Sequence, residues 1–184
     1  RMINNLNIQS FNFISDKGFK NNFNYYLKNT ITAGKNNVEY DSSPEVKFSN
    51  IIEMQSSFPL VKVDENYLSY IDPKLSLRIN PSSMKFYGDA KRKISSDNIF
   101  NINRLGLIDT LETGQNITLG INYKKEKLDN INKFFEAKLG TVFRTKVNKD
   151  IPSSSTINKK RSNYFGKIKN SFNDNISLDY EFSV

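Results

Sequence analysis

The chain has 184 residues, with 27 lysines and arginines against 19 aspartates and glutamates, so its formal net charge is +8. It contains neither cysteine nor histidine, which excludes disulfides, thiolate or imidazole metal sites, and catalysis by a cysteine or histidine side chain. The mean hydropathy of −0.58 is low for a packed soluble domain, yet 12% of the residues are aromatic, which favours strands with one apolar face over disorder.

Alternation of apolar and polar residues dominates the chain and predicts strands. In "EVKFSNIIEMQ" (45–55), Val46, Phe48, Ile52 and Met54 share one face, and the charged residues share the other. A helical period fits only "KEKLDNINKFFEAKL" (125–139), and the second half of that stretch fits the alternation of a strand better than the period of a helix. We therefore predict an all-β chain of about eight strands, in chain order near residues 5–14, 22–33, 45–62, 67–79, 115–126, 133–146, 163–172 and 175–184.

The connections between these strands alternate in length. Short ones are predicted near residues 15–21, 63–66, 127–132 and 173–174, and longer ones at 34–44, 80–114 and 147–162. This alternation is typical of outer-membrane barrels, which have short turns at one end and longer loops at the other. No run of about 18 apolar residues is present, which excludes a transmembrane helix. The predicted fold class is an antiparallel up-and-down meander, part of a transmembrane outer-membrane β-barrel.

The polar faces of the predicted strands carry charges along their whole length, which requires contact with water. In a membrane barrel such a face lines the lumen, whereas in a soluble sheet it faces bulk solvent. No basic helix or RNA-binding signature gathers the basic residues, so we expect no nucleic-acid partner. The candidate lumen-facing cations, which a solvated lumen wall would account for, are Lys47, Lys74, Arg78, Lys138 and Arg144.

Four stretches resemble, in order and spacing, segments of a known family. They are "FPLVKV" (58–63), "YIDPKLSLRINP" (70–81), "DNIFNINRLGLIDTLETGQNITLGINY" (97–123) and "RSNYFGKIKNSFNDNISLDYEF" (161–182). Through them the chain resembles the LptD (OstA) family, the outer-membrane barrel that inserts lipopolysaccharide into the outer leaflet. The third stretch matches the family motif at Asn98, Phe100, Asn103, Arg104, Asp109, Glu112 and Gly114.

The third stretch also departs from the family motif, because Thr110 and Asn116 stand where other members have arginines. If those arginines pair with the acids in other members, the ionic network here is thinner, and Arg104, Asp109 and Glu112 must satisfy one another or water. We interpret the stretch as a polar loop pinned by Arg104 at the barrel mouth, with direct contact to lipopolysaccharide head groups as the alternative. A glycosidase carboxylate pair of Asp109 and Glu112 is a further alternative, although sugar-binding aromatic residues are missing around it.

The resemblance implies a transporter and not an enzyme, so we expect no catalytic residue, metal or cofactor. It implies the outer membrane of a Gram-negative bacterium, lipopolysaccharide and outer-membrane lipid as ligands, and a plug lipoprotein and periplasmic transport components as partners. The chain begins at Arg1 and does not include the family's periplasmic jellyroll. We therefore expect residues 1–184 to form a single segment of the barrel domain.

Three other interpretations remain open. Eight strands can close into a small membrane barrel, a porin segment would add a constriction loop, and a soluble β-sandwich binding module would pack its apolar faces against each other. Pairing of the first strand with the last would favour the small closed barrel. Unpaired edges would favour a segment of a larger one.

Overall fold

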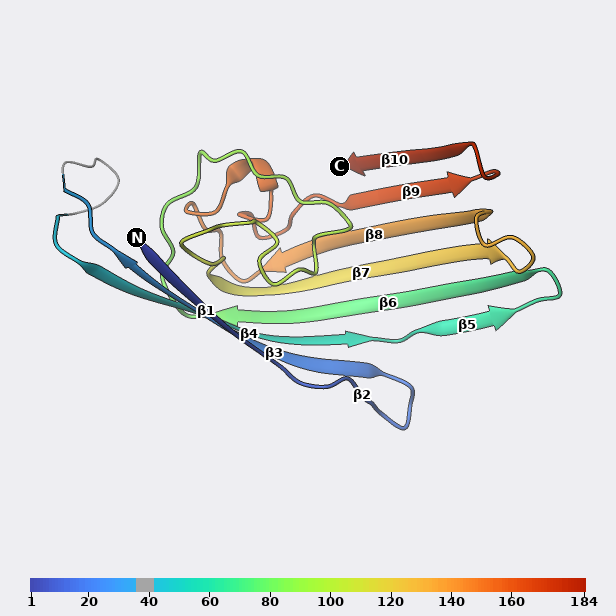
Figure 1. The fold of residues 1–184 in the computed structure, drawn as a ribbon, viewed down its shortest axis with the longest axis horizontal. Coiled ribbons are helices and arrows are strands. Elements are labelled where there is room, and N and C mark those ends of the chain that lie inside the picture. The colour runs from blue at the N-terminus through green and yellow to red at the C-terminus, as the bar shows by residue number, and fades with distance from the viewer. Residues whose placement is uncertain (36–41) are drawn as a thin grey trace.

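A computed structural model describes residues 1–35 and 42–184. Within these residues, ten strands form one antiparallel sheet (Figure 1). The predicted loop at 34–44 lies partly outside the described residues. The strands are β1 (Met2–Gln9), β2 (Phe13–Ile14), β3 (Lys20–Thr32), β4 (Glu45–Ser57), β5 (Leu60–Val63), β6 (Tyr67–Asn80), β7 (Gly114–Lys127), β8 (Phe134–Arg144), β9 (Phe165–Ser171) and β10 (Ser177–Ser183).

The ten strands occupy eight positions in the order β1-β3-β4-β6-β7-β8-β9-β10. Two positions hold two strands each, because β1 and β2 both pair with β3, and β4 and β5 both pair with β6. Thus β2 continues the line of β1, and β5 continues that of β4. The break between β4 and β5 contains Pro59, which has no backbone N–H to donate to a neighbouring strand. The all-β meander and its antiparallel order are therefore confirmed, with two of the predicted strands each divided in two.

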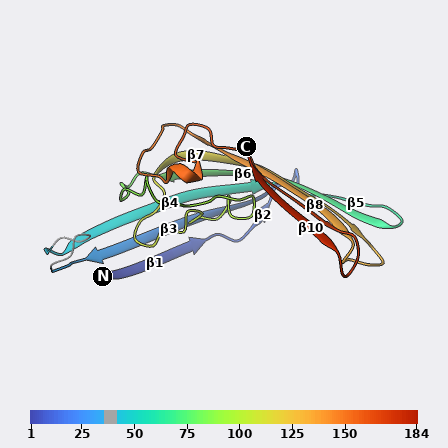
Figure 2. The same cartoon turned by 90° about the horizontal axis from the view of Figure 1, so that it is seen from above.

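The sheet is open. Strands β1 and β10 end the order at opposite edges and do not pair with each other, and the sheet is twisted along its length (Figure 2). The pairing that would favour a small closed barrel is therefore not seen. No helix among the described residues is long and apolar enough to cross a membrane.

The two faces of the sheet differ sharply. One face, called here the apolar face, presents aliphatic and aromatic side chains at every one of the eight positions, and these are exposed at all positions except β9, where Ile168 is half-buried. Neighbours in register such as Met54, Leu77 and Ile117 continue this face from strand to strand. Its exposed members include Leu6, Ile8, Phe23, Val46, Phe48, Ile52, Leu77, Ile79, Ile117, Leu119, Ile121, Phe135, Leu139, Phe143, Leu178 and Tyr180. The opposite face, the polar face, carries most of the charged residues of the strands, whereas Lys125 of β7 lies on the apolar face, in register with Phe135.

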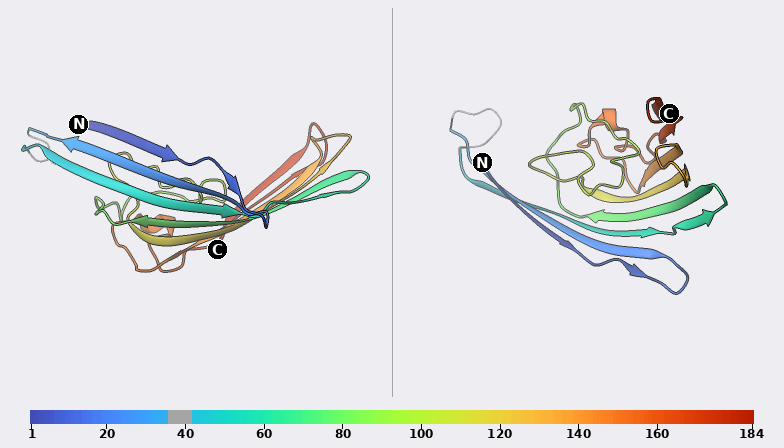
Figure 3. Two further views of the ribbon diagram at one scale, coloured as in Figure 1. Left: turned by 90° about the horizontal axis from the view of Figure 1, so that it is seen from below. Right: turned by 45° about the vertical axis from the view of Figure 1, so that its right-hand side comes forward.

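Two long loops, 81–113 and 145–164, lie on the polar face, inside the curve of the sheet (Figure 3). Loop 145–164 contains the single-turn 3-10 helix η1 (Ser153–Ser155). Backbone hydrogen bonds join the loops, from Tyr87 N to Asp150 O (2.8 Å) and from Ser153 N to Gly88 O (3.0 Å). The two loops therefore form one layer.

A hydrophobic cluster lies between this layer and strands β7, β8 and β9. It consists of Ile94, Ile99, Leu105, Leu107, Val142, Ile151, Ile157 and Phe165, all buried. Gly120 and Gly140 face each other across β7 and β8 and leave room for the loop. A Cβ at Gly120 would lie 2.6 Å from the Phe100 ring, and one at Gly140 would lie 3.2 Å from Ile99 Cδ1. The alternating pattern did not predict this core, since its loop members do not alternate.

Candidate functional site

The carboxylate of Glu112 lies at the end of loop 81–113, directly before β7, and is buried between two arginines. Arg104 of the same loop binds it in a bidentate manner, with Nε 2.7 Å from Oε2 and Nη2 2.6 Å from Oε1. Arg144, the last residue of β8, donates from Nη1 to Oε1. Such paired geometry gives the strongest hydrogen bonds that a carboxylate makes with arginine.

A second buried carboxylate, Glu53 of β4, continues the network. Arg78 of β6 donates to its Oε1 from Nη2 at 2.5 Å, and Ser76 Oγ donates to the same oxygen at 2.8 Å. The other amino group of Arg78, Nη1, lies 3.8 Å from Glu112 Oε2. The two carboxylates are thus joined into one ionic network, which consists of Glu53, Arg78, Arg104, Glu112 and Arg144.

Neutral polar groups satisfy much of the remaining hydrogen-bonding capacity of this network. Arg104 donates from Nη1 to Thr118 Oγ1 (2.8 Å) and from Nη2 to Asn116 Oδ1 (3.1 Å). Asn116 in turn donates to Glu112 Oε1 at 3.1 Å. Asn116 stands where the family motif has an arginine, but β6 and β8 supply Arg78 and Arg144 to the same carboxylate. Arginines of two strands therefore reach Glu112 in addition to Arg104, and a network thinner than that of other family members stays a prediction.

The electrostatics of the network follow from its burial. Burial by itself would raise the pKa of Glu112, but attraction to Arg104 and hydrogen bonds from it, together with Arg144 and Arg78, lower this pKa to about 2. The network holds one more arginine than glutamate. Every carboxylate in it is therefore held in the charged form, as salt bridges in a region of low polarity require.

The pKa of Glu112 predicts acid sensitivity. Because this pKa falls from 4.5 in the unfolded chain to about 2 in the folded one, its contribution to stability is complete above about pH 4.5 and is lost as the pH falls towards 2. We expect the free energy of unfolding of the wild type to fall over this window by on the order of 2 kcal/mol more than that of Glu112→Gln. Urea titrations at several pH values measure this difference, and equal pH profiles for both proteins would contradict it.

The other motif residues shape the loop around this network. Asn98 Oδ1 accepts a hydrogen bond from Ser95 N (2.9 Å), and Asn103 Oδ1 accepts one from Leu107 N (3.1 Å), so both close turns. Phe100 packs over Gly120. Gly114 has a φ of +91°, and a Cβ there would lie 2.8 Å from Arg144 Nη2, so only glycine fits at the start of β7 without strain.

Asp109 lies apart from the ionic network. Its carboxylate accepts a hydrogen bond from the Tyr87 hydroxyl and lies 3.7 Å from Lys85 Nζ. The backbone carbonyls of Ile108 and Asp109 accept hydrogen bonds from Lys28 Nζ (2.5 Å) and Thr30 Oγ1 (3.1 Å) of β3. Asp109 and Glu112 therefore bind different partners, and the structure does not bring them together as a pair of catalytic acids.

The five candidate cations all lie on the polar face, and each forms an ion pair. Arg78 and Arg144 belong to the ionic network, Lys74 pairs with Asp72 at 3.2 Å, and Lys47 pairs with Glu45 at 2.9 Å. Lys138 Nζ lies 2.8 Å from Asp97 Oδ1, and Lys167 of β9 lies 2.9 Å from Oδ2 of the same carboxylate. These hydrogen bonds lower the pKa of Asp97 and fasten loop 81–113 to β8 and β9.

Sequence reasoning missed Lys28, Lys167 and Tyr87 as anchors of the loop, and it noted Glu53 only as a polar-face residue. Alternation places Glu53 and Lys28 on the correct face but does not indicate that a loop covers them. Among the described residues, no group of histidine, cysteine, aspartate or glutamate side chains is arranged to hold a metal ion.

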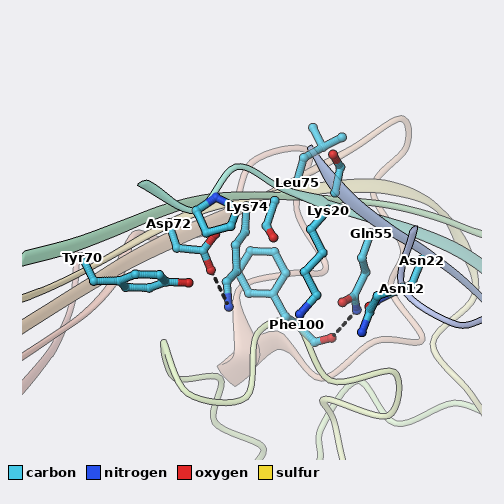
Figure 4. A pocket seen from close by; sticks show the side chains of 12 residues that line it. Asn12, Lys20, Asn22, Gln55, Tyr70, Asp72, Lys74, Leu75 and Phe100 are labelled. Carbon is cyan, nitrogen blue, oxygen red and sulfur yellow. Dashed lines mark hydrogen bonds and ion pairs between the residues drawn. The ribbon is translucent and has the colours of Figure 1, made fainter. Parts of the chain in front are cut away.

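A pocket of about 260 Å³ opens on the polar face beside the ionic network. Strands β3, β4 and β6 form its floor, and Phe100 of loop 81–113 borders it (Figure 4). Its lining includes two lysines and one aspartate, namely Lys20, Lys74 and Asp72. It is the part of this face where polar groups of three strands converge on open space.

Comparison with protein-family models identifies the chain. The model "LptD: LPS transport system D" matches residues 10–183, which is nearly the whole sequence. The chain belongs to the LptD family. The sequence matches none of the curated proteins with which it was compared. LptD is a lipopolysaccharide transport family of the Gram-negative outer membrane and not an enzyme family, and the match extends over all four stretches that carried the resemblance.

Proposed function

We propose that this LptD-family chain forms part of the wall of an outer-membrane β-barrel through which lipopolysaccharide reaches the outer leaflet. Residues 1–184 are one segment of that barrel. The apolar face contacts the lipid, and the polar face lines the aqueous interior. The ligands are lipopolysaccharide and outer-membrane lipid, and a plug lipoprotein and periplasmic transport components are the partners. Transport of this kind requires no covalent step and no cofactor.

The observation that carries this proposal is the unbroken apolar face. Apolar side chains occupy all eight positions of the sheet, from Leu6 and Ile8 in β1 to Leu178 and Tyr180 in β10, and are exposed at every position except β9, where Ile168 is half-buried. Soluble proteins rarely leave so large an apolar surface in water. Within a bilayer, backbone groups must be paired, and strands that alternate between lipid and lumen satisfy this requirement once their sheet closes.

The position of the long loops also supports a sheet whose polar face is directed to the interior. Both described long loops lie on the polar face, whereas a soluble β-sandwich would need its second layer on the apolar face. The long loops also leave the sheet at the end opposite its short turns, as in outer-membrane barrels. Loops 81–113 and 145–164 would therefore narrow the interior at its outer end.

The proposal is tested by placing a charge on the apolar face. Leu119 lies in the middle of β7 and is 41% exposed, so we expect Leu119→Arg in the full-length protein to lower the free energy of unfolding in lipid vesicles by about 2–4 kcal/mol. We also expect less lipopolysaccharide at the cell surface. Leu119→Phe serves as the control and should retain both properties. A wild-type protein that folds as a monomer in buffer without detergent or lipid would contradict the proposal.

A further inference from the structure

The pocket on the polar face contains a buried acceptor that lacks a donor. Asp72 of β6 is 4% exposed. Its Oδ2 atom pairs with Lys74 Nζ at 3.2 Å, and the Tyr70 hydroxyl also interacts with the Asp72 carboxylate, but the Oδ1 atom is buried without a hydrogen-bond partner. A buried acceptor left unsatisfied is costly and is rare in folded proteins. A ligand that donates a hydrogen bond would satisfy Asp72 Oδ1.

The cations of the pocket add a preference for negative charge. Figure 4 shows the side chains of Lys20, Lys74 and Asp72 directed into the same space. Lys20, at the start of β3, is exposed. It forms no ion pair with any of the residues that the structure describes. Because the pocket holds two lysines and one aspartate, it has one cation in excess, and a ligand with one anionic group would balance it.

Neutral polar groups complete the lining and are suited to hydroxyl groups. The amides of Asn12 and Asn22 hydrogen-bond to each other at 3.3 Å, and Gln55 donates to Phe100 O at 3.1 Å. Tyr70 extends towards Asp72 (Figure 4). The volume of about 260 Å³ lies just below the range of about 300–1,000 Å³ that is typical for drug-sized ligands. The pocket therefore accommodates a single small polar unit.

We propose that this pocket binds one sugar residue that carries an anionic substituent. A sugar hydroxyl donates to Asp72 Oδ1, the anionic group lies against Lys20 and Lys74, and the amides of Asn12 and Asn22 contact the remaining hydroxyls. Where the sugar belongs to lipopolysaccharide in transit, the inference rests on the proposed function. A free sugar phosphate offers the same chemistry, so the two sources must be tested separately.

Ligand-observed NMR on the full-length protein in detergent micelles tests this site with defined probes, namely glucose 6-phosphate, glucose, and the oligosaccharide of fully deacylated lipopolysaccharide. We expect glucose 6-phosphate to bind about tenfold more tightly than glucose. Asp72→Asn removes the charge that strengthens the hydrogen bond from the sugar hydroxyl and should weaken the binding of glucose about tenfold, whereas for glucose 6-phosphate the loss of a negative charge from the pocket offsets part of this effect. Lys20→Gln should weaken only the binding of the phosphorylated sugar, and because Lys20 is exposed, this variant should fold.

Lys62→Gln is the matched control, since Lys62 is an exposed lysine of β5 outside the pocket and its replacement should leave binding unchanged. Binding of glucose 6-phosphate that is equal in the wild type, Asp72→Asn and Lys20→Gln overturns the inference, as does binding of none of the three probes. If lipopolysaccharide still reaches the cell surface in that case, the proposed function stands without this site. Binding of glucose 6-phosphate without binding of the deacylated oligosaccharide supports the pocket and overturns lipopolysaccharide as its source.

Discussion

Replacement of Glu112 by glutamine is expected to lower the free energy of unfolding by about 3–5 kcal/mol, the usual cost of removing one partner from a buried ion pair. The Glu112 carboxylate binds both Arg104 and Arg144. The substitution therefore leaves the side chains of both arginines buried with no carboxylate within bonding distance. Urea titration of the full-length protein in detergent micelles measures the loss. Limited proteolysis should then cleave within loop 81–113, whose last turn is held by these contacts.

The matched control for this substitution is Glu65→Gln. Glu65 lies in the short turn between β5 and β6 and is exposed, so its replacement should change the free energy of unfolding by less than about 0.5 kcal/mol. A loss below about 1 kcal/mol for Glu112→Gln, together with an uncleaved loop, would show that the neutral partners Asn116 and Thr118 suffice to hold the arginines.

Truncation of Ile99 is expected to cost about 2–5 kcal/mol, the range for removing a large aliphatic side chain from a core. Ile99 is fully buried in the cluster beneath the loops, where its Cδ1 and Cγ2 atoms lie against Gly140. Ile99→Ala leaves a cavity there that the paired strands β7 and β8 cannot close by moving. Denaturant titration measures the loss, and Ile108→Ala in the same loop, at a site 57% exposed, should be nearly neutral.

A second substitution tests whether the cavity is the cause of this loss. Gly140→Ala is tight in the wild type, because the new Cβ would lie 3.2 Å from Ile99 Cδ1. In the Ile99→Ala background the contacts with Ile99 are removed and only Leu119 O remains close, at 3.3 Å, so we expect the new methyl group to recover part of the lost stability. If Gly140→Ala is equally harmful in both backgrounds, the cost of Ile99→Ala does not arise from packing against β8.

The strands could be predicted from the sequence because each one has an apolar face and a polar face. Residues 67–79 and 115–126 were predicted as strands and correspond to β6 (Tyr67–Asn80) and β7 (Gly114–Lys127). Alternation is a local property that can be followed from one residue to the next. Their pairing then follows from the short turns and from chain order, since neighbouring strands of a meander are adjacent in sequence.

The layer over the polar face could not be predicted in the same way. Arg78 and Glu112 are separated by a long loop, and nothing local indicates that Arg78 lies near Glu112 while Asp109 binds Tyr87 instead. The motif with Asn98, Arg104 and Glu112 marked the right segment, but the arginines that complete its network come from strands β6 and β8. Likewise, the apolar residues of the loop, such as Ile99 and Leu107, do not recur at a regular spacing, so the sequence does not indicate that this loop is buried.

The ionic network has a consequence for how the sheet is assembled. Three of its charged groups come from β4, β6 and β8 and two from loop 81–113, and Asn116 and Thr118 of β7 also bind Arg104. A slip of one residue in β4, β6 or β8 would turn Glu53, Arg78 or Arg144, respectively, to the opposite face, among side chains such as Leu77 and Ile117. If the apolar face contacts lipid as proposed, a misaligned hairpin would then place an unpaired charge in the bilayer. The ionic network therefore favours one alignment of β4, β6, β7 and β8 over any alignment shifted by one residue.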